Sequence, residues 1–186
     1  MFRGSEERRN PLLEEHRREE FEASLLPHLA AAYNLARWLV RNDHDAEDVV
    51  QESYLRACKF FNGFHGGDGR AWLLTIVRNT CYTWFQQNRP RELTQSLDDA
   101  AGNIESDAPS PEAELLKSAD RTLVSTALEE LPLEFREILV LREMEGMSYK
   151  EISDISGIPL GTVMSRLARA RKRLQQSLTL KMTREA

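Results

Sequence analysis

The sequence predicts an all-α protein made of two small helical domains joined by a flexible acidic linker, with a helix-turn-helix in the second domain. Three observations lead to this fold. Apolar residues recur at three- and four-residue intervals in almost every patterned segment, and no useful stretch alternates as a strand does. An acidic segment interrupts the pattern near the middle of the chain. Finally, a short glycine-containing turn separates two helical stretches toward the C-terminal end.

The pattern divides the chain into four parts. From Pro90 to Ser110 acids predominate and large apolar residues are few, so this segment cannot bury enough surface to offset its ordering entropy. Ser110 and Pro111 then supply an N-cap and a first helical position for the next domain. The predicted parts are a charged extension, residues 1–20; a first domain, 21–89; an acidic linker, 90–110; and a second domain, 111–181.

Three helices are expected in the first domain. One covers residues 21–42, where Pro27 is tolerated near the start or at a kink. A second begins at Asp45, the expected N-cap. A glycine-rich break precedes the third, which opens near Arg70 and should end at Pro90.

Composition predicts a soluble chain without a membrane anchor. The 186 residues carry a formal net charge of −5 and 41% of them are hydrophobic, which is enough for one ordinary core or two small ones. No window reaches the roughly 18 uninterrupted apolar residues of a membrane span, and the charged start lacks a signal peptide's apolar run. We expect a cytoplasmic protein that does not insert into a membrane.

The residues that usually carry catalysis or bind metals form no recognisable group. Cys58 and Cys81 are far apart, without a CxxC pair, and we expect both to be buried free thiols; a redox switch is the alternative. The four histidines are scattered, and there is no HExxH, GxSxG or Walker motif. We therefore predict no catalytic residue, no metal site, no cofactor and no enzymatic activity.

Charge is segregated along the chain. Residues 43–52 contain five acids and no lysine or arginine, residues 70–91 contain four arginines and no acid, and residues 160–181 contain six bases and no acid. Screening limits each charge to about 10 Å of reach. An acidic protein can therefore still bind nucleic acid through its basic segments.

Residues 148–174 have the pattern of a helix-turn-helix. Ser148 and Glu151 form a capping box that starts one helix, and Gly157 can supply the left-handed residue that ends it. The second helix begins near Leu160 and is basic on one side, so it can enter a major groove; a solvated surface helix is the alternative. Early residues would reach base edges and later ones phosphates. The expected DNA contacts are Thr162, Met164, Ser165, Arg166, Arg169, Arg171, Lys172 and Arg173.

The first domain carries two contrasting surfaces. In DAEDVVQES, polar and acidic residues lie one turn apart on the helix face opposite the valines. An acidic face of this kind needs either a basic protein partner or solvent around it, and the charges alone favour solvent. The third helix interleaves aromatic residues with arginines, as stacking on unpaired bases requires. Trp72 and Phe85 could equally be core residues. The aromatic and basic set is Trp72, Tyr82, Trp84 and Phe85 with Arg70, Arg78, Asn79, Arg89 and Arg91.

The sequence resembles the extracytoplasmic-function (ECF) group of bacterial sigma factors from about Phe21 to Leu178. Four motifs in family order carry the resemblance: DAEDVVQESYLRA, RAWLLTIVRNTCYTWF, LEELPLEFREILVLREMEGMSYKEIS and GIPLGTVMSRLARARKRL. The resemblance implies a transcription initiation factor that binds core RNA polymerase, recognises a bipartite promoter and helps to melt it. It also implies an anti-sigma factor as a partner.

Site residues follow from the same resemblance. The acidic helix would dock on the clamp helices of the polymerase's largest subunit through Asp45, Glu47, Asp48, Gln51 and Glu52. The loop at 64–70 and the helix after it would open the minus 10 element and pocket a flipped base through Phe64, Arg70, Trp72, Arg78, Asn79 and Tyr82. The helix-turn-helix would read the minus 35 element through Thr162, Ser165, Arg166, Arg169, Lys172 and Arg173.

Two departures from the family leave the promoter sequence open, and two other functions compete. Met164 stands where many relatives carry a basic residue, and the loop HGGDG is rich in glycine. A stand-alone helix-turn-helix regulator would bind a palindromic site as a dimer, without polymerase. An adaptor would bind a regulatory protein through its first domain. The regulator leaves the acidic helix and the aromatic helix unexplained.

Overall fold

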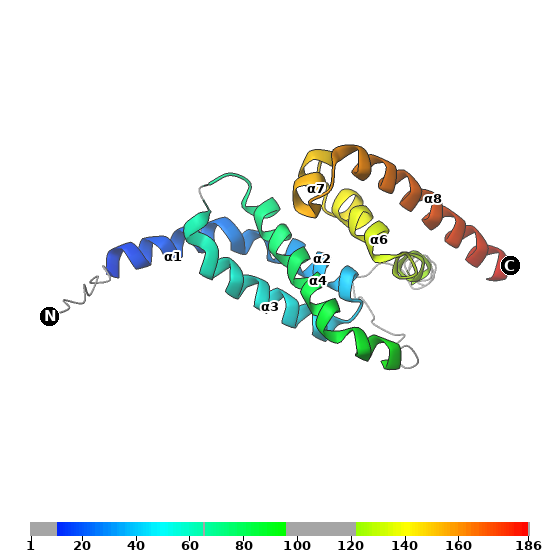
Figure 1. Cartoon of the computed structure of the whole chain (residues 1–186), viewed down its shortest axis with the longest axis horizontal. Helices are drawn as coiled ribbons and strands as arrows, with labels where there is room; N and C mark the ends of the chain where they lie inside the picture. Colours follow the sequence, from blue (N-terminus) through cyan, green and yellow to red (C-terminus); the bar gives the residue numbers. More distant parts are fainter. Residues whose placement is uncertain (1–10, 65, 96–121, 186) are drawn as a thin grey trace, which may run out of the picture.

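The computed structural model describes residues 11–64, 66–95 and 122–185, and within those ranges every regular element is helical (Figure 1). The all-α prediction is confirmed. Most of the predicted linker lies outside the described residues, as does the predicted helix start at Ser110. In the described ranges, no helix is both long and apolar enough to cross a membrane.

The first helical unit is a bundle. Its leucines, valines and alanines recur every three or four residues, so each helix turns an apolar stripe toward its neighbours. The second, third and fourth helices pack on one another, and the first packs on the fourth. The helices are α1, Pro11–Leu25; α2, Leu29–Val40; α3, Asp43–Phe60; and α4, Gly69–Gln95. Buried residues include Leu35, Leu39, Val49, Leu73 and Leu74.

Helix ends in this unit differ from the predicted ones. α1 covers residues 11–20, which belong to the predicted extension, and Pro27 lies in a 3-10 turn between α1 and α2. The N-cap of α3 is Asn42 rather than Asp45, because the Asn42 side chain accepts a hydrogen bond from the Asp45 backbone N–H at 3.0 Å. Asn and Asp cap equally well, so the sequence does not rank them.

The prediction that Pro90 ends the third helix is wrong, because α4 continues to Gln95. A proline within a helix removes one backbone hydrogen bond and costs about 3 kcal/mol. The remaining hydrogen bonds of a long helix can offset that cost. Residues 91–95 of the predicted linker are therefore helical.

The second unit contains the helix-turn-helix. Residues 122–129 form a helix that leads into α6, Leu133–Leu139, and a π-helical turn, Val140–Met144, follows it. Next come α7, Tyr149–Ser156, and α8, Leu160–Glu185, which packs on both α6 and α7. The buried core of this unit includes Phe135, Ile138, Leu141, Ile152, Ile155, Val163 and Leu167.

Local signals predicted for the helix-turn-helix are confirmed. The Glu151 N–H donates to the Ser148 hydroxyl at 3.2 Å, and the Ser148 N–H donates to the Glu151 carboxylate at 2.6 Å. Hydrogen bonding to Ser148 lowers the pKa of Glu151. Gly157 ends α7 with a φ of 69°, a left-handed conformation in which glycine carries no steric penalty.

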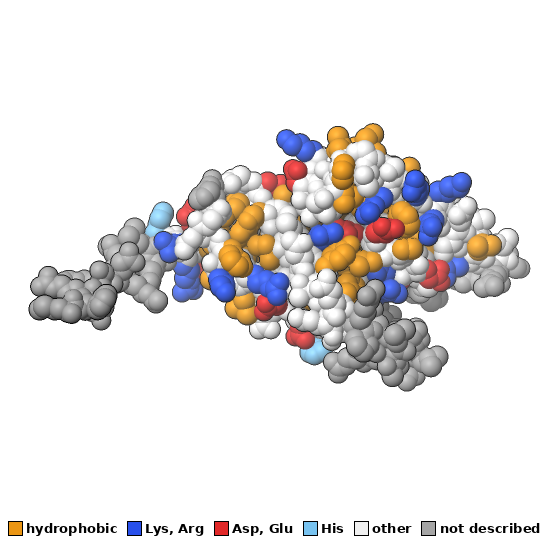
Figure 2. All heavy atoms as spheres, viewed as in Figure 1, with side chains coloured by type: hydrophobic (Ala, Val, Ile, Leu, Met, Phe, Trp, Pro, Cys, Tyr) orange, Lys and Arg blue, Asp and Glu red, His pale blue; other side chains and the backbone are white. Residues whose placement is uncertain are grey.

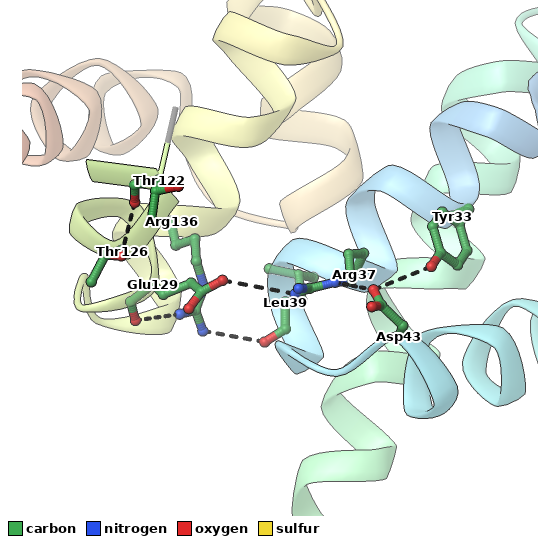
Figure 3. A network of polar contacts seen from close by, with 8 residues as sticks. All are labelled: Tyr33, Arg37, Leu39, Asp43, Thr122, Thr126, Glu129 and Arg136. Atoms are coloured by element: carbon green, nitrogen blue, oxygen red, sulfur yellow. Dashed lines mark hydrogen bonds and ion pairs between the residues drawn. The ribbon is translucent and has the colours of Figure 1, made fainter. Parts of the chain in front are cut away.

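The two units pack against each other and share an apolar core, with α2 against α6 and α4 against α7 (Figure 1). Arg136 of α6 is fully buried at this contact. Its guanidinium donates to the Glu129 carbonyl at 2.7 Å and, across the contact, to the Leu39 carbonyl at 3.2 Å (Figure 3). Leu39 lies in the last turn of α2, where carbonyls lack helical partners. Arg136 therefore ties the second unit to the first.

The two cysteines have different environments. Cys81 is buried as predicted, but Cys58 is exposed, so the prediction of two buried thiols is wrong for Cys58. Cys58 is the residue after the buried Ala57 on α3, so its side chain leaves the helix in a different direction and reaches solvent. Burial, with the nearby charge of Glu137, raises the pKa of the Cys81 thiol to about 12, so it stays protonated at neutral pH.

Gly69 allows α4 to approach the end of α1. A Cβ at this position would lie 2.7 Å from the Ser24 backbone carbonyl oxygen, too close for either helix to stay in place. We expect Gly69→Ala to lower the free energy of unfolding by about 1–3 kcal/mol, measured by urea denaturation with circular dichroism. Gly161→Ala is the control, because a Cβ there meets nothing within 4 Å. Equal effects of the two variants would contradict the close approach.

Candidate nucleic-acid interface

The basic side of α8 presents residues predicted to contact DNA. The apolar residues of the helix face the core of the unit, which turns the opposite side to solvent. Ser165, Arg169 and Lys172 are exposed there. Figure 2 shows lysine and arginine side chains standing out over α7 and α8. A stripe of this kind can follow a groove of DNA and neutralise its phosphates.

Other residues of the predicted minus 35 set have contacts within the protein. Arg166 forms an ion pair with Glu134 at 3.4 Å, and the Arg173 guanidinium lies 4.8 Å from the centroid of the Phe135 ring. Thr162 is half-buried. An exposed ion pair contributes little net free energy, so a DNA phosphate could replace Glu134 at low cost.

Apolar side chains share this surface with the basic ones. Met164 is 52% exposed and Leu160 is 48% exposed, close to the start of α8. In the major groove, the thymine methyl group is recognised by apolar contact. Met164 is therefore suited to contact a base, whereas a basic residue at the same position would suit a phosphate.

The aromatic members of the predicted minus 10 set belong partly to the core. The ring centroids of Phe64 and Trp72 lie 5.0 Å apart, and both rings contact the buried Phe61. Trp84 and Phe85 form an edge-to-face pair at 5.3 Å and are half-buried. These contacts stabilise the bundle around the start and the middle of α4.

Arg78 and Tyr82 of α4 contact a carboxylate of the second unit. Arg78 Nε donates to Glu137 Oε1 at 2.7 Å, and the Tyr82 hydroxyl donates to Glu137 Oε2 at 2.6 Å. The Arg78 guanidinium also lies 4.2 Å from the centroid of the Tyr82 ring. Burial is the largest effect on the pKa of Arg78 and lowers it, but the attraction and hydrogen bond of Glu137, together with Tyr82, leave that pKa raised. The pKa of Tyr82 is raised, first by burial and then by Glu137. Asn79, beside Arg78, is exposed.

Arg70 contacts a second carboxylate of the same unit. Its guanidinium forms an ion pair with Glu145, and Asn34 of α2 donates to the other Glu145 oxygen at 2.5 Å. The Glu145 side chain is only 6% exposed. Arg70 and Arg78 are therefore both held by acids of the second unit.

Acidic and apolar residues meet on the outer side of the first unit. The exposed residues of the predicted docking set are Glu47, Asp48, Gln51 and Glu52, while Asp45 is half-buried. Glu47 and Gln51 also line an apolar groove of about 820 Å³ between α1, α2 and α3. Leu55, which lines it too, is 64% exposed. An apolar groove edged by acids fits an amphipathic helix with basic flanks.

Sequence reasoning did not identify the acids that hold the arginines, nor the apolar groove. Glu137 lies between Phe135 and Ile138 in a strongly apolar helix, and a charge at a core-facing position is the signal that could have found it. Glu145 carries no such signal, because the other unit covers it. Leu55 follows Gln51 and Glu52 by about one helical turn, and an apolar residue on this polar side of the helix is the signal that marks the groove.

Comparisons with known proteins agree with this architecture. Residues 26–91 match the family Sigma-70 region 2, and residues 121–174 match Sigma-70, region 4. The ECF RNA polymerase sigma-E factor of Haemophilus influenzae is 35% identical over 151 residues, 77% of this chain and 79% of that protein. The ECF RNA polymerase sigma factor SigE of Mycolicibacterium smegmatis is 34% identical over 151 residues, 81% of this chain but 58% of that protein.

A solved structure shares the arrangement of helices. The sigma factor RpoE of Bartonella quintana, crystallised in complex with the anti-sigma factor NepR, has a TM-score of 0.66 and 32% identity, over 87% of this chain and 98% of that one. A first helical unit that matches Sigma-70 region 2 and a helix-turn-helix unit that matches region 4, in that order along the chain, define a sigma-70-type protein. The chain belongs to the ECF group of RNA polymerase sigma factors.

Proposed function

We propose that this protein is a transcription initiation factor that binds core RNA polymerase and directs it to promoters with two short elements. The observation that carries the proposal is the match of the two units to sigma regions 2 and 4, in that order along the chain. The protein acts by binding, in the cytoplasm, and the polymerase performs the chemistry.

The second unit reads the minus 35 element in this proposal. Arg169 and Lys172 are exposed on α8 and supply the positive charge. Met164 and Ser165 lie early in the helix, where side chains reach base edges. The exposure of Met164 favours a thymine-containing element, because an apolar side chain can contact the thymine methyl group.

The first unit opens the minus 10 element. Arg70, Arg78 and Tyr82 offer two positive charges and an aromatic ring along α4, and Asn79 is exposed among them. This combination suits unpaired bases, which are held by stacking and by phosphate contacts. Phe64 and Trp72 support this surface by packing against each other near the start of α4, with partial exposure left for DNA.

Polymerase docks on the acidic face of α3 and the groove beside it. The proposed partner is the pair of clamp helices in the largest polymerase subunit, whose basic residues would meet Asp48 and Glu52. Leu55 at the rim of the groove adds an apolar contact. An anti-sigma factor is a further proposed partner, since the similar RpoE was crystallised with one.

Run-off transcription from a promoter library tests the proposal, with purified core polymerase of the source bacterium present in every reaction. We expect protein-dependent transcripts from templates that share two short elements at a fixed spacing. Binding to a palindrome without polymerase would support the stand-alone regulator instead. A complete lack of protein-dependent transcripts, with folded protein and active core, would favour the adaptor.

A further inference from the structure

We infer that an apolar stripe at the start of α8 reads thymine methyl groups, so that the minus 35 element contains two thymines within about two base-pair steps of each other. The stripe consists of Leu160, Met164 and Ala168, which follow one another at four-residue intervals. The inference rests on the proposed function, because it takes α8 as the helix that enters the major groove. Its new content is the chemical group that is read and the part that Leu160 and Ala168 take in reading it.

The stripe faces solvent although it is apolar. Leu160 is 48% exposed and Met164 is 52% exposed, and Ala168 is exposed one turn further on. Val163 and Leu167, the apolar residues on the other side of the same turns, are buried in the core. Packing within the protein therefore does not use the stripe. A partner that removes these side chains from water would gain free energy from the contact.

Helix geometry directs the stripe toward base edges. Side chains four residues apart share a helix face, and each leans toward the start of its helix. In a helix-turn-helix, the early residues of the second helix are the ones that contact bases. Leu160 and Met164 are separated by about 6 Å along the axis, and successive base pairs by roughly 3.4 Å. The two side chains can therefore reach methyl groups about two base-pair steps apart.

The polar side chains of the same turns are already engaged inside the protein. The Ser165 hydroxyl donates to the Thr162 carbonyl at 3.1 Å, and Thr162 is itself half-buried. Arg166 would first have to leave Glu134, with which it pairs at 3.4 Å. Apolar contact is therefore the means of base recognition that the first turns of α8 offer without any rearrangement.

The charges around the stripe favour DNA over a protein as its partner. Residues 160–181 contain six bases and no acid, and Arg169 and Lys172 are exposed near the stripe. In the major groove, the apolar group on the base edges is the thymine methyl, and phosphates line both sides of the groove. An apolar stripe with basic neighbours matches that arrangement. A protein partner would instead need an apolar surface with acidic edges.

Exchange of thymine for deoxyuridine tests the methyl group alone, because deoxyuridine keeps the hydrogen-bonding groups of thymine and lacks only the methyl. The full chain is assembled with core polymerase, and each thymine in the minus 35 element of a library-selected promoter is replaced in turn. The affinity of the assembled enzyme for the promoter is measured by fluorescence anisotropy. We expect a loss of about fourfold at each of two positions, as for one methyl-sized group returned to water. Exchange of a thymine between the two promoter elements is the control.

A double variant links the methyl effect to the stripe. Leu160→Ala with Met164→Ala should bind the thymine promoter about tenfold more weakly and lose most of its preference for thymine over deoxyuridine. Both side chains are exposed, and alanine favours a helix, so the fold should be kept; circular dichroism checks this. Met182→Ala is the matched control, because Met182 is 62% exposed on α8 about 27 Å from Met164. It should behave like wild type on both templates.

Four results would overturn the inference while the proposed function stands. They are a minus 35 element without thymines, a deoxyuridine exchange without effect, a thymine preference that persists in the double variant, and a double variant that binds promoters normally but core polymerase weakly. The last result would make the stripe a protein contact. In all four cases the library promoters still give protein-dependent transcripts. A complete lack of such transcripts would overturn the proposed function, and the inference with it.

Discussion

Asp48→Lys combined with Glu52→Lys should abolish binding to core RNA polymerase and, with it, protein-dependent transcription. Both side chains are exposed on α3, beside the apolar groove. Placing like charges against a basic partner costs several kcal/mol, which corresponds to a loss of about a hundredfold or more in affinity. The affinity is measured by fluorescence anisotropy with labelled protein and purified core, and transcription by the run-off assay.

A control with the same change in net charge separates docking from general electrostatics. Glu15→Lys with Glu19→Lys reverses two exposed acids of α1 at the same spacing along a helix. This control should retain most of the polymerase affinity. Asp48 should contribute more than Glu52 when each is changed alone, because Glu52 already pairs with Arg56 at 2.7 Å. Unchanged affinity of the double variant would rule out this face as the docking surface.

Arg166→Ala combined with Arg169→Ala should remove recognition of the minus 35 element. Arg169 is exposed on α8, and Arg166 can exchange Glu134 for DNA. Each specific base contact is worth about 1–3 kcal/mol, and each lost phosphate contact lowers the salt slope of binding by about 0.9. Transcription from library-selected promoters should therefore fall about a hundredfold, with a shallower dependence on salt.

The matching control removes a positive charge from the same helix, far from the residues proposed to contact DNA. Lys181 lies about 22 Å along α8 from Arg166 and pairs with Glu130 at 2.6 Å. Lys181→Ala should leave promoter selection and the salt slope close to wild type. The double variant should also bind core polymerase normally, since the docking face lies on the other unit. If the Arg166→Ala, Arg169→Ala double variant kept full promoter activity, α8 would not read the minus 35 element and its basic side would only face solvent.

Local signals in the sequence were sufficient wherever a few neighbouring residues decide the conformation. The capping box of Ser148 and Glu151 and the left-handed Gly157 act within one turn of chain, so they are read directly from residue types. The start of α3 shows the limit of this reasoning, because Asn42 and Asp45 are equally good caps. Pro90 shows it again, since a helix with enough other hydrogen bonds can run through a proline.

The sequence alone determined the all-α fold, the helix-turn-helix and the residue types of the proposed DNA and polymerase surfaces, because helical periodicity and charge segregation are properties of neighbouring residues. Only the tertiary structure revealed that Arg78 and Arg70 meet Glu137 and Glu145, and that Cys58 is exposed. Those pairings join residues far apart in the chain, and no local pattern reports which distant surface covers a given side chain. Whether an arginine is available to DNA is therefore decided by the packing of the two units.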